Sequence, residues 1–431
     1  MAKQTKVDMR GLTIYQVFPR QHSEKQNFEG VIDDLDRIAN MGVDIIYLLP
    51  FHPIGKVSRK GLKGSPYSIV DFYKIDKDLG TLEDLKRLVE KAHKKNMKVM
   101  MDIVFNHTSK DSVLTQEHPE WFYRKSDGSL ANRVGDWSDI TDLNYDLEEV
   151  QDYFVDVLVY WASIVDGFRC DVAPLLPIDF WIKARKEVEK NSPDIIWLTE
   201  SVHPEFIKYI RDQGYDCSSD GQMYDAFDMC YEYDIFDFMD AYLLKDSKKL
   251  SRWLEEIYRQ EMIYPKNYIK IRGFENHDQR RLRDKVRDHK HFMNMLTMMF
   301  FLKGTTFIYA GLEHEIDHLP NLFEDDVIVW NPKQSLETYI KKLTDMKKEP
   351  IFSHGVFNMH AHDQIAVFSY EYKEDMILGI FNLENLDDIE VPLTDGSYED
   401  FLSMRKIEVN HGKIKLDEKP IIIKTHKGRR R

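Results

Sequence analysis

The sequence predicts a closed (β/α)8 TIM barrel followed by a smaller antiparallel β-domain. Over residues 1–350, short apolar runs alternate with longer amphipathic stretches, which is typical of parallel strands connected by helices. About eight strand–helix units fit in this length, the number that a (β/α)8 barrel requires. Over residues 351–431 the pattern changes to short alternating strands separated by turn signals, which indicates a β-sandwich. An open doubly wound sheet is the alternative, but no GxGxxG motif follows any strand.

The expected barrel strands are apolar runs rich in Ile, Val, Leu and Tyr. They lie at residues 12–18, 43–50, 97–105, 165–170, 195–200, 268–274 and 305–311, with a weaker candidate at 222–229. Helical spacing of apolar residues predicts helices over 28–41, 81–96 and 148–165. Thr81, followed three residues later by Asp84, resembles a capping box at the start of the second of these helices.

The connection after the third strand is unusually long. About forty residues separate this strand from the next helix, and loops of that length are usually functional. We therefore expect a short inserted subdomain at about residues 107–146 of the barrel domain.

Composition and charge exclude several classes of protein. The chain has 431 residues and a formal net charge of −14, which opposes nonspecific binding to nucleic acid or to an anionic membrane. No signal-peptide-like segment opens the chain, and its most apolar run, residues 295–302, is far too short to cross a membrane. Three scattered cysteines suggest a reducing compartment. We expect a cytoplasmic protein; its oligomeric state stays open.

Charged residues gather where the expected strands end. Arg169 and Asp171 are two residues apart, so on a strand both side chains face the same way. Asp102 and Glu200 end two further strands, and the pair His277 and Asp278 follows another. The carboxyl ends of barrel strands meet at one face, where the active sites of such barrels lie. We therefore expect these side chains to form one site.

Paired carboxylates with a close arginine suit glycoside hydrolysis, in which one carboxylate is ionised and the other holds a proton. Arg169 should lower the pKa of Asp171. Glu200 has no arginine beside it in the sequence, so its pKa should be higher. No cysteine cluster, HExxH, Walker loop or GxSxG motif offers another chemistry. Aromatic residues expected around the rim could stack on sugar rings: Tyr15, Tyr67, Trp121 and Trp137.

Several stretches together resemble the α-amylase family, glycoside hydrolase family 13. Four short stretches stand in the family's order at strand ends: "MDIVFNHT", "DGFRCDVA", "WLTES" and "FENHD". Three more segments are similar to family segments: "TDLNYD", "GSPYSIVDFY" and "IYAGLE". The resemblance spans about residues 10–420 and implies a retaining α-glycoside hydrolase.

The resemblance also implies a role for each residue of the expected site. Asp171 would be the nucleophile, Glu200 the general acid and then base, and Asp278 the residue that stabilises the transition state. Substrate-binding and supporting roles fall to five further residues: Tyr67, Asp102, His107, Arg169 and His277. Among these, Tyr67 would stack on the sugar, the two histidines would contact its hydroxyls, Arg169 would keep Asp171 ionised, and Asp102 would organise the site from beneath.

The sequence also departs from the family's patterns. "VAPLL" stands after Asp171 where many extracellular α-amylases have a Lys-His pair, and "KGSPY" lacks the Asp of exo-acting α-glucosidases. Asn106 and Asp142 match two calcium-ligand positions, but we find no further ligands, so no cofactor is expected to be required and calcium is only a weak candidate.

We interpret the chain as an enzyme that cleaves α-1,4-glucosidic bonds in maltooligosaccharides or starch-derived dextrins, with an α-glucan oligosaccharide as its binding partner. Three alternatives stay open: a 4-α-glucanotransferase or other transglycosylase, a disaccharide-specific enzyme for sucrose or an α-1,6 bond, and a non-catalytic binding subunit. All three carboxylates are present, which disfavours the last.

Overall fold

An eight-stranded parallel sheet forms the centre of the molecule, in a computed structural model that describes residues 4–135, 137–244, 249–360 and 363–429. The terminal limits predicted for the two domains, residues 1 and 431, lie outside these ranges. The strand order is β8-β7-β6-β3-β2-β1-β10-β9, and a parallel bridge between Cys230 and Lys270 joins the two edges. The strands are β1 (Thr13–Val17), β2 (Ile45–Leu48), β3 (Lys98–Ile103), β6 (Gly167–Cys170), β7 (Ile196–Thr199), β8 (Met229–Cys230), β9 (Ile271–Arg272) and β10 (Thr305–Tyr309). The predicted barrel is confirmed.

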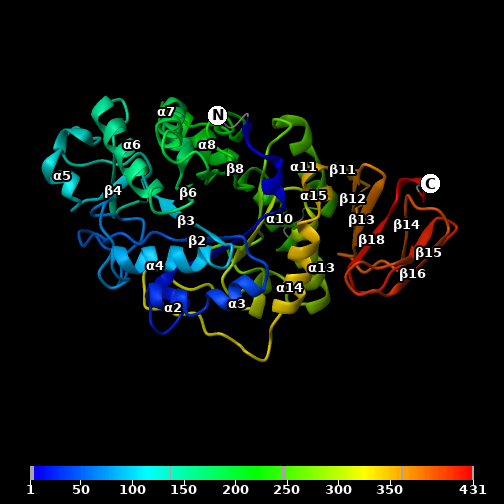
Figure 1. Ribbon diagram of the computed structural model, residues 1–431. Helices are drawn as coiled ribbons and strands as arrows, with labels where there is room; N and C mark the ends of the chain where they lie inside the picture. Colours follow the sequence, from blue (N-terminus) through cyan, green and yellow to red (C-terminus); the bar gives the residue numbers. More distant parts are fainter. Residues whose placement is uncertain (1–3, 136, 245–248, 361–362, 430–431) are drawn as a thin grey trace.

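Helices surround this sheet (Figure 1). The longer ones are α4 (Leu82–His93), α6 (Glu148–Ala162), α7 (Ile178–Glu189), α8 (Pro204–Asp212), α10 (Tyr233–Leu243), α11 (Leu250–Ile263), α13 (His289–Phe301) and α14 (Glu337–Lys347). The shorter ones are α1 (Pro19–His22), α2 (Phe28–Ile32), α3 (Leu35–Asn40), α5 (Val113–Glu117), α9 (Asp220–Met223), α12 (Leu282–Lys285) and α15 (Pro350–His354). Short 3-10 turns are η2 (Val7–Gly11), η3 (Pro119–Trp121), η4 (Ala173–Leu175), η5 (Leu312–His314) and η6 (Lys427–Arg429).

Local signals explain where the helical predictions succeed and fail. The predicted capping box is present, since Thr81 and Asp84 each bond the other's backbone N–H at the start of α4. The helix predicted over 28–41 is divided into α2 and α3. The strand predicted over 222–229 is wrong for most of its length, because a second capping box at Ser219 starts α9 and leaves only a short β8.

The inserted segment carries a two-stranded antiparallel ribbon. Its strands are β4 (His107–Ser109) and β5 (Ile140–Asp142), and His107 pairs with Asp142 across the ribbon. Helix α5 and turn η3 lie between the strands in the chain. The ribbon therefore holds together the first and last residues of a long excursion from the barrel.

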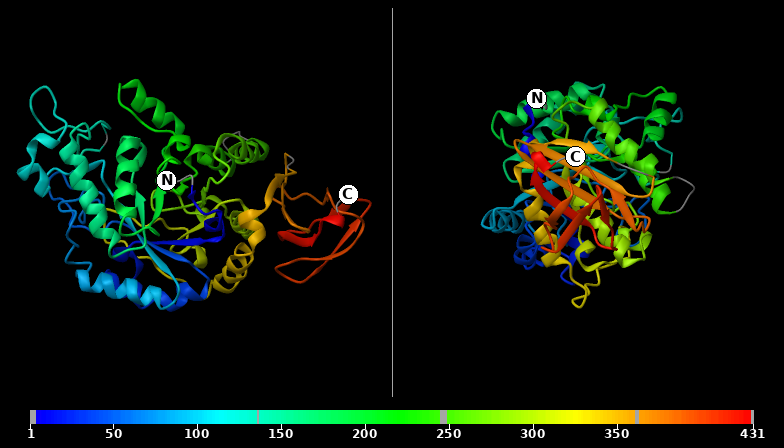
Figure 2. Two further views of the ribbon diagram at one scale, coloured as in Figure 1. Left: turned by 45° about the horizontal axis from the view of Figure 1, so that its top comes forward. Right: turned by 90° about the vertical axis from the view of Figure 1, so that its right-hand side faces the viewer.

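The C-terminal part consists of two four-stranded antiparallel sheets. One contains β11 (Val356–Met359), β12 (Ala366–Tyr372), β13 (Asp375–Phe381) and β18 (Ile421–His426); the other contains β14 (Asp388–Glu390), β15 (Gly396–Glu399), β16 (Lys406–Asn410) and β17 (Lys413–Lys415). Residues from both sheets form one apolar cluster, including Val367, Leu378 and Ile414. Figure 2 shows these sheets at the end of the molecule opposite the insertion.

The apolar run at residues 295–302 belongs to α13, which contacts the C-terminal sheet. Phe301 packs against Phe381, and its carbonyl accepts a hydrogen bond of 2.9 Å from Tyr370. A helix buried against the barrel and this sheet needs apolar residues on more than one side. Among the described residues, no helix combines the length and apolar character needed to cross a membrane.

Candidate active site

Three adjacent strands of the barrel bring the predicted charged residues together. β3, β6 and β7 are neighbours in the sheet, and Asp102 on β3 lies in register with Arg169 on β6. Asp171 follows β6 directly, and Glu200 follows β7 directly. Because the strands are parallel, these side chains meet at the carboxyl-end face of the barrel.

Arg169 is the centre of this set and is fully buried. Its Nη1 donates to Asp102 at 2.8 Å and to Asp171 at 3.0 Å. Its Nη2 lies 2.7 Å from Oε1 of Glu200. The two groups form an ion pair, but their geometry is not that of a hydrogen bond. One guanidinium therefore contacts three carboxylates.

The expectation that Arg169 lowers the pKa of Asp171 is wrong, whereas the pKa of Glu200 is raised as expected. Burial, the charge of Glu200 and other nearby carboxylates outweigh Arg169 and raise the pKa of Asp171. Burial and the charge of Asp278 likewise raise the pKa of Glu200, although Arg169 opposes them. The prediction for Asp171 failed because it considered only Arg169, its neighbour in the sequence, and not burial or the carboxylates that approach from other strands. Two coupled carboxyls with raised pKa values retain one proton between them over part of the pH range.

A strained turn connects these two carboxyls. Val172 has φ 35° and ψ 38°, in the left-handed region that β-branched residues rarely adopt. In this conformation its backbone N–H donates to Oε2 of Glu200 at 2.8 Å. Strain of this kind persists where the surrounding structure enforces it, and such positions cluster at active sites.

A polar relay extends from Asp102 to the far side of the site. Asp102 accepts hydrogen bonds from Tyr47 and, at 3.1 Å, from Tyr67. The Tyr67 hydroxyl is 2.6 Å from Nε2 of His277, and the two rings stack at 5.6 Å. The side-chain amide nitrogen of Gln16 lies 2.9 Å from Nδ1 of His277, so both ring nitrogens of this histidine have a polar partner.

Asp278 is the exposed member of the set. Its side chain is 47% exposed, whereas Asp171 and Glu200 are buried. Partial burial raises its pKa, but the charge and the hydrogen bond of His277, 3.0 Å away, outweigh this and lower the pKa. Asp278 is therefore the carboxylate most readily kept ionised.

His107 and the two calcium candidates surround another arginine. His107 is buried, and burial lowers its pKa. Oδ1 of Asn106 accepts a hydrogen bond from Arg133, and Oδ2 of Asp142 accepts one from the same guanidinium at 2.9 Å. The oxygens that calcium would need are already bound by a cation. Within the described ranges, no cluster of three or more His, Cys, Asp or Glu residues suits a metal ion.

The four aromatic residues expected at the rim have different surroundings. Tyr15 lies outside the barrel and is fully buried, with its hydroxyl donating to Glu313, so a rim position is wrong for it. Trp121 is buried and stacks on His118 at 3.9 Å inside the insertion. Trp137 remains partly exposed, 5.6 Å from the ring of His107. Tyr67 lies in the site, as described above.

Sequence reasoning missed four residues that contact the predicted site: Gln16, Tyr47, Arg133 and Val172. Gln16 and Tyr47 lie inside expected strands, where their polarity was the only available signal. Arg133 lies in the long insertion, and nothing in its local sequence indicates a partner. The left-handed conformation of Val172 contradicts the preference of its residue type, so no pattern could reveal it.

Comparison with known proteins places this geometry in a family. The family model for the α-amylase catalytic domain matches residues 16–137 and 132–355, and the model for the bacterial α-amylase C-terminal domain matches residues 357–423. An α-amylase from Lactobacillus plantarum has a similar crystal structure, with a TM-score of 0.94, 41% identity, and coverage of 97% of this chain and 100% of that one. A noncanonic maltogenic α-amylase, AmyB from Thermotoga neapolitana, gives a TM-score of 0.86 at 28% identity, covering 97% and 99%.

A curated relative widens the range of activities. An α-1,4-glucan:maltose-1-phosphate maltosyltransferase from Picrophilus torridus is 27% identical over 89% of this chain and 63% of its own length. The chain spans less than two thirds of the length of the curated relatives that it matches first. The catalytic-domain match over most of the barrel nevertheless shows that this chain belongs to the α-amylase family of glycoside hydrolases.

Proposed function

We propose that this chain hydrolyses α-1,4-glucosidic bonds of maltooligosaccharides or starch-derived dextrins with retention of configuration. The arrangement around Arg169 carries this proposal. One buried guanidinium contacts Asp171 and Glu200, and burial raises the pKa of both carboxyls. A pair of carboxyls that holds one proton supplies the nucleophile and the acid of a retaining glycosidase.

The proposed reaction has two displacements at the anomeric carbon. A carboxylate oxygen of Asp171 bonds to this carbon, while Glu200 donates its proton to the departing glycosidic oxygen. Glu200 then takes a proton from water, the water oxygen bonds to the anomeric carbon, and the bond to Asp171 breaks. Two inversions leave the α configuration in the product.

The free chain must rearrange before the first step, because both oxygens of Glu200 already face donors. Oε2 accepts from Val172, and Oε1 pairs with Arg169, which favours the ionised form. An entering sugar must therefore displace one contact so that the proton of the pair passes to Glu200. Asp278, ionised and exposed, is placed to accept hydrogen bonds from sugar hydroxyls.

The remaining site residues would bind the sugar or support the acids. We assign Tyr67, His107 and His277 to the sugar, and Arg169 and Asp102 to the positioning of the two catalytic carboxyls. The three cysteines are buried free thiols, which fits the reducing interior of a cell as the place of action.

A time course with maltoheptaose tests the proposal. Shorter maltooligosaccharides, released first as α anomers, are the expected products, and proton NMR of the new reducing ends measures the configuration. Release of β anomers would contradict the double displacement. No change in the maltoheptaose would contradict the substrate class and direct attention to sucrose or α-1,6 bonds.

The similarity to a maltosyltransferase makes glycosyl transfer the second candidate. Transfer uses the same intermediate, but a sugar hydroxyl replaces water in the second step. Products longer than seven glucose units in the maltoheptaose reaction would show that transfer dominates. Added maltose should then increase the yield of longer products, whereas it would leave a hydrolase's product sizes unchanged.

A further inference from the structure

Arg133 joins three parts of the chain with one buried side chain. Its side chain is 7% exposed and lies in the insertion between β4 and β5. Both Nε and the backbone N–H donate to Oδ2 of Asp142 at 2.9 Å. The other two nitrogens donate to Oδ1 of Asn106 and, at 3.2 Å, to the backbone carbonyl of Leu175.

The hydrogen-bond acceptors of this guanidinium are all oxygens. A carboxylate, an amide carbonyl and a backbone carbonyl are the ligand types that a hard divalent cation takes in proteins. We propose that the guanidinium of Arg133 takes the place of such a cation, and that Arg133 is a positioning residue for the active site.

The first consequence concerns the direction of a hydrogen bond. Because Oδ1 of Asn106 accepts from Arg133, its Nδ2 faces Nδ1 of His107, 3.2 Å away. The amide must donate, so Nδ1 of His107 accepts and the ring proton is on Nε2. A metal ion would also select Oδ1 of Asn106, so the cation fixes this tautomer in either case.

The tautomer affects the next residue of the site. His107 also faces the backbone of Tyr67, whose hydroxyl reaches Asp102 and His277. Arg133 thus supports Tyr67 through Asn106 and His107, without contacting the reacting atoms itself.

The second consequence concerns the turn after the proposed nucleophile. Leu175 ends η4, which follows Asp171 and the strained Val172 in the chain. The bond from Arg133 to the carbonyl of Leu175 therefore ties this turn to the insertion. Loss of the bond should loosen both sides of the site together.

Melting temperatures test the replacement of the cation. EDTA and millimolar calcium should leave the melting temperature of the unmodified protein unchanged, because Arg133 already binds the oxygens. R133A should lower it by about 5 °C or more, since Asp142 becomes a buried charge without its partner. R124A is the matched control, because Arg124 is an exposed arginine of the same insertion whose guanidinium, among the described residues, donates to two backbone carbonyls within it. An EDTA-sensitive unmodified protein, or equal melting of R133A and R124A, would overturn the proposal.

Kinetics of R133K test the positioning role in a variant that keeps the charge. A lysine reaches fewer of the three acceptors, so we expect KM for maltoheptaose to rise at least threefold while kcat changes less. Unchanged KM and kcat would refute the link to Tyr67. The kinetic test rests on the proposed function, whereas the melting temperatures do not depend on any activity. Failure of the proposed function can therefore be distinguished from failure of the role proposed for Arg133.

Discussion

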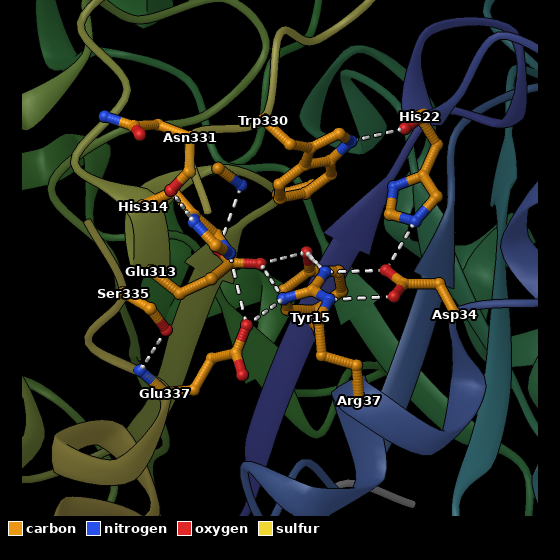
Figure 3. Close-up of polar contacts among 12 residues, drawn as sticks. Tyr15, His22, Asp34, Arg37, Glu313, His314, Trp330, Asn331, Ser335 and Glu337 are labelled. Carbon is orange, nitrogen blue, oxygen red and sulfur yellow. Dashed lines mark hydrogen bonds and ion pairs between the residues drawn. The ribbon is translucent and has the colours of Figure 1, made fainter. Parts of the chain in front are cut away.

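Two arginines, each beside three carboxylates, lie on opposite sides of the barrel strands: Arg169 is fully buried, and Arg37 is partly exposed. Arg169 contacts Asp102, Asp171 and Glu200 within the barrel. Arg37, on α3, contacts Asp34, Glu313 and Glu337 outside it (Figure 3). Strand β1 separates the two clusters, because successive side chains on a strand point to opposite faces, with Gln16 reaching His277 and Tyr15 reaching Glu313.

The clusters differ in how completely their polar atoms are paired. Every nitrogen of the Arg37 guanidinium donates a hydrogen bond. His22 and Arg37 outweigh the effect of burial and lower the pKa of Asp34 to about 2. Nε and Nη2 of Arg169, in contrast, have no hydrogen-bond partner in the described part of the chain. Complete pairing around Arg37 stabilises the fold, whereas burial and mutual repulsion leave the carboxyls around Arg169 able to retain a proton and available for chemistry.

Loss of the proposed nucleophile should give the largest effect. D171N removes the carboxylate without changing its volume, so kcat on maltoheptaose should fall by at least about 10⁴-fold. Far-UV circular dichroism should match the unmodified protein. A kcat for D171N within tenfold of that of the unmodified protein would show that Asp171 is not the nucleophile. The cluster around Arg169 would then not differ from the cluster around Arg37 in the way proposed.

The general acid should give a smaller effect that depends on the leaving group. E200Q cannot donate a proton, so hydrolysis of maltoheptaose should fall by about 10²–10⁴-fold. An aryl α-maltooligosaccharide with an activated leaving group needs less protonation and should lose much less in the glycosylation step. Burst kinetics separate that step from deglycosylation. If the rate of the glycosylation step fell equally for maltoheptaose and for the aryl substrate, Glu200 would not be the general acid.

The strand-end residues were predictable because a parallel barrel brings all carboxyl ends to one face. This rule alone groups Asp102, Arg169 and Glu200, since each stands at the end of an apolar run. Tyr15 lies in the middle of an apolar run and was expected at the rim only because it is aromatic, yet it faces outward. Its direction depends on which residue of β1 starts the strand, and a shift of one position reverses the side of every residue.

Contacts across long loops were not predictable. Arg133 binds Asn106 and Asp142 only after the insertion folds back, and Glu313 meets Arg37 across 276 positions. The pKa of Asp171 was misjudged for the same reason, because the burial and the neighbouring carboxylates that raise it arise only when the strands assemble.

The cluster around Arg37 should contribute to stability but not to catalysis. E313Q leaves Arg37 with one charged partner fewer in a buried setting, so the free energy of unfolding should fall by about 3 kcal/mol. Values of kcat and KM should stay within twofold of those of the unmodified protein. Urea denaturation followed by tryptophan fluorescence measures the first quantity. A large loss of kcat at unchanged stability would show that the cluster around Arg37 belongs to the catalytic apparatus.

Stability as a function of pH should distinguish the clusters by sign. The raised pKa of Asp171 means that its stability contribution is complete below the unfolded pKa and is lost as pH rises through the folded one. D171N should therefore melt at a higher temperature than the unmodified protein at neutral pH, and this difference should disappear in acid.

The lowered pKa of Asp34, about 2, predicts the opposite dependence: its stability contribution is present above the unfolded pKa and is lost as pH falls through the folded pKa. D34N should lose about 2 kcal/mol near pH 7 and progressively less towards pH 3. If D171N and D34N differed in stability from the unmodified protein with the same sign at neutral pH, the proposed difference between the two clusters would be wrong. Both arginines would then stabilise the ionised form of their carboxylates.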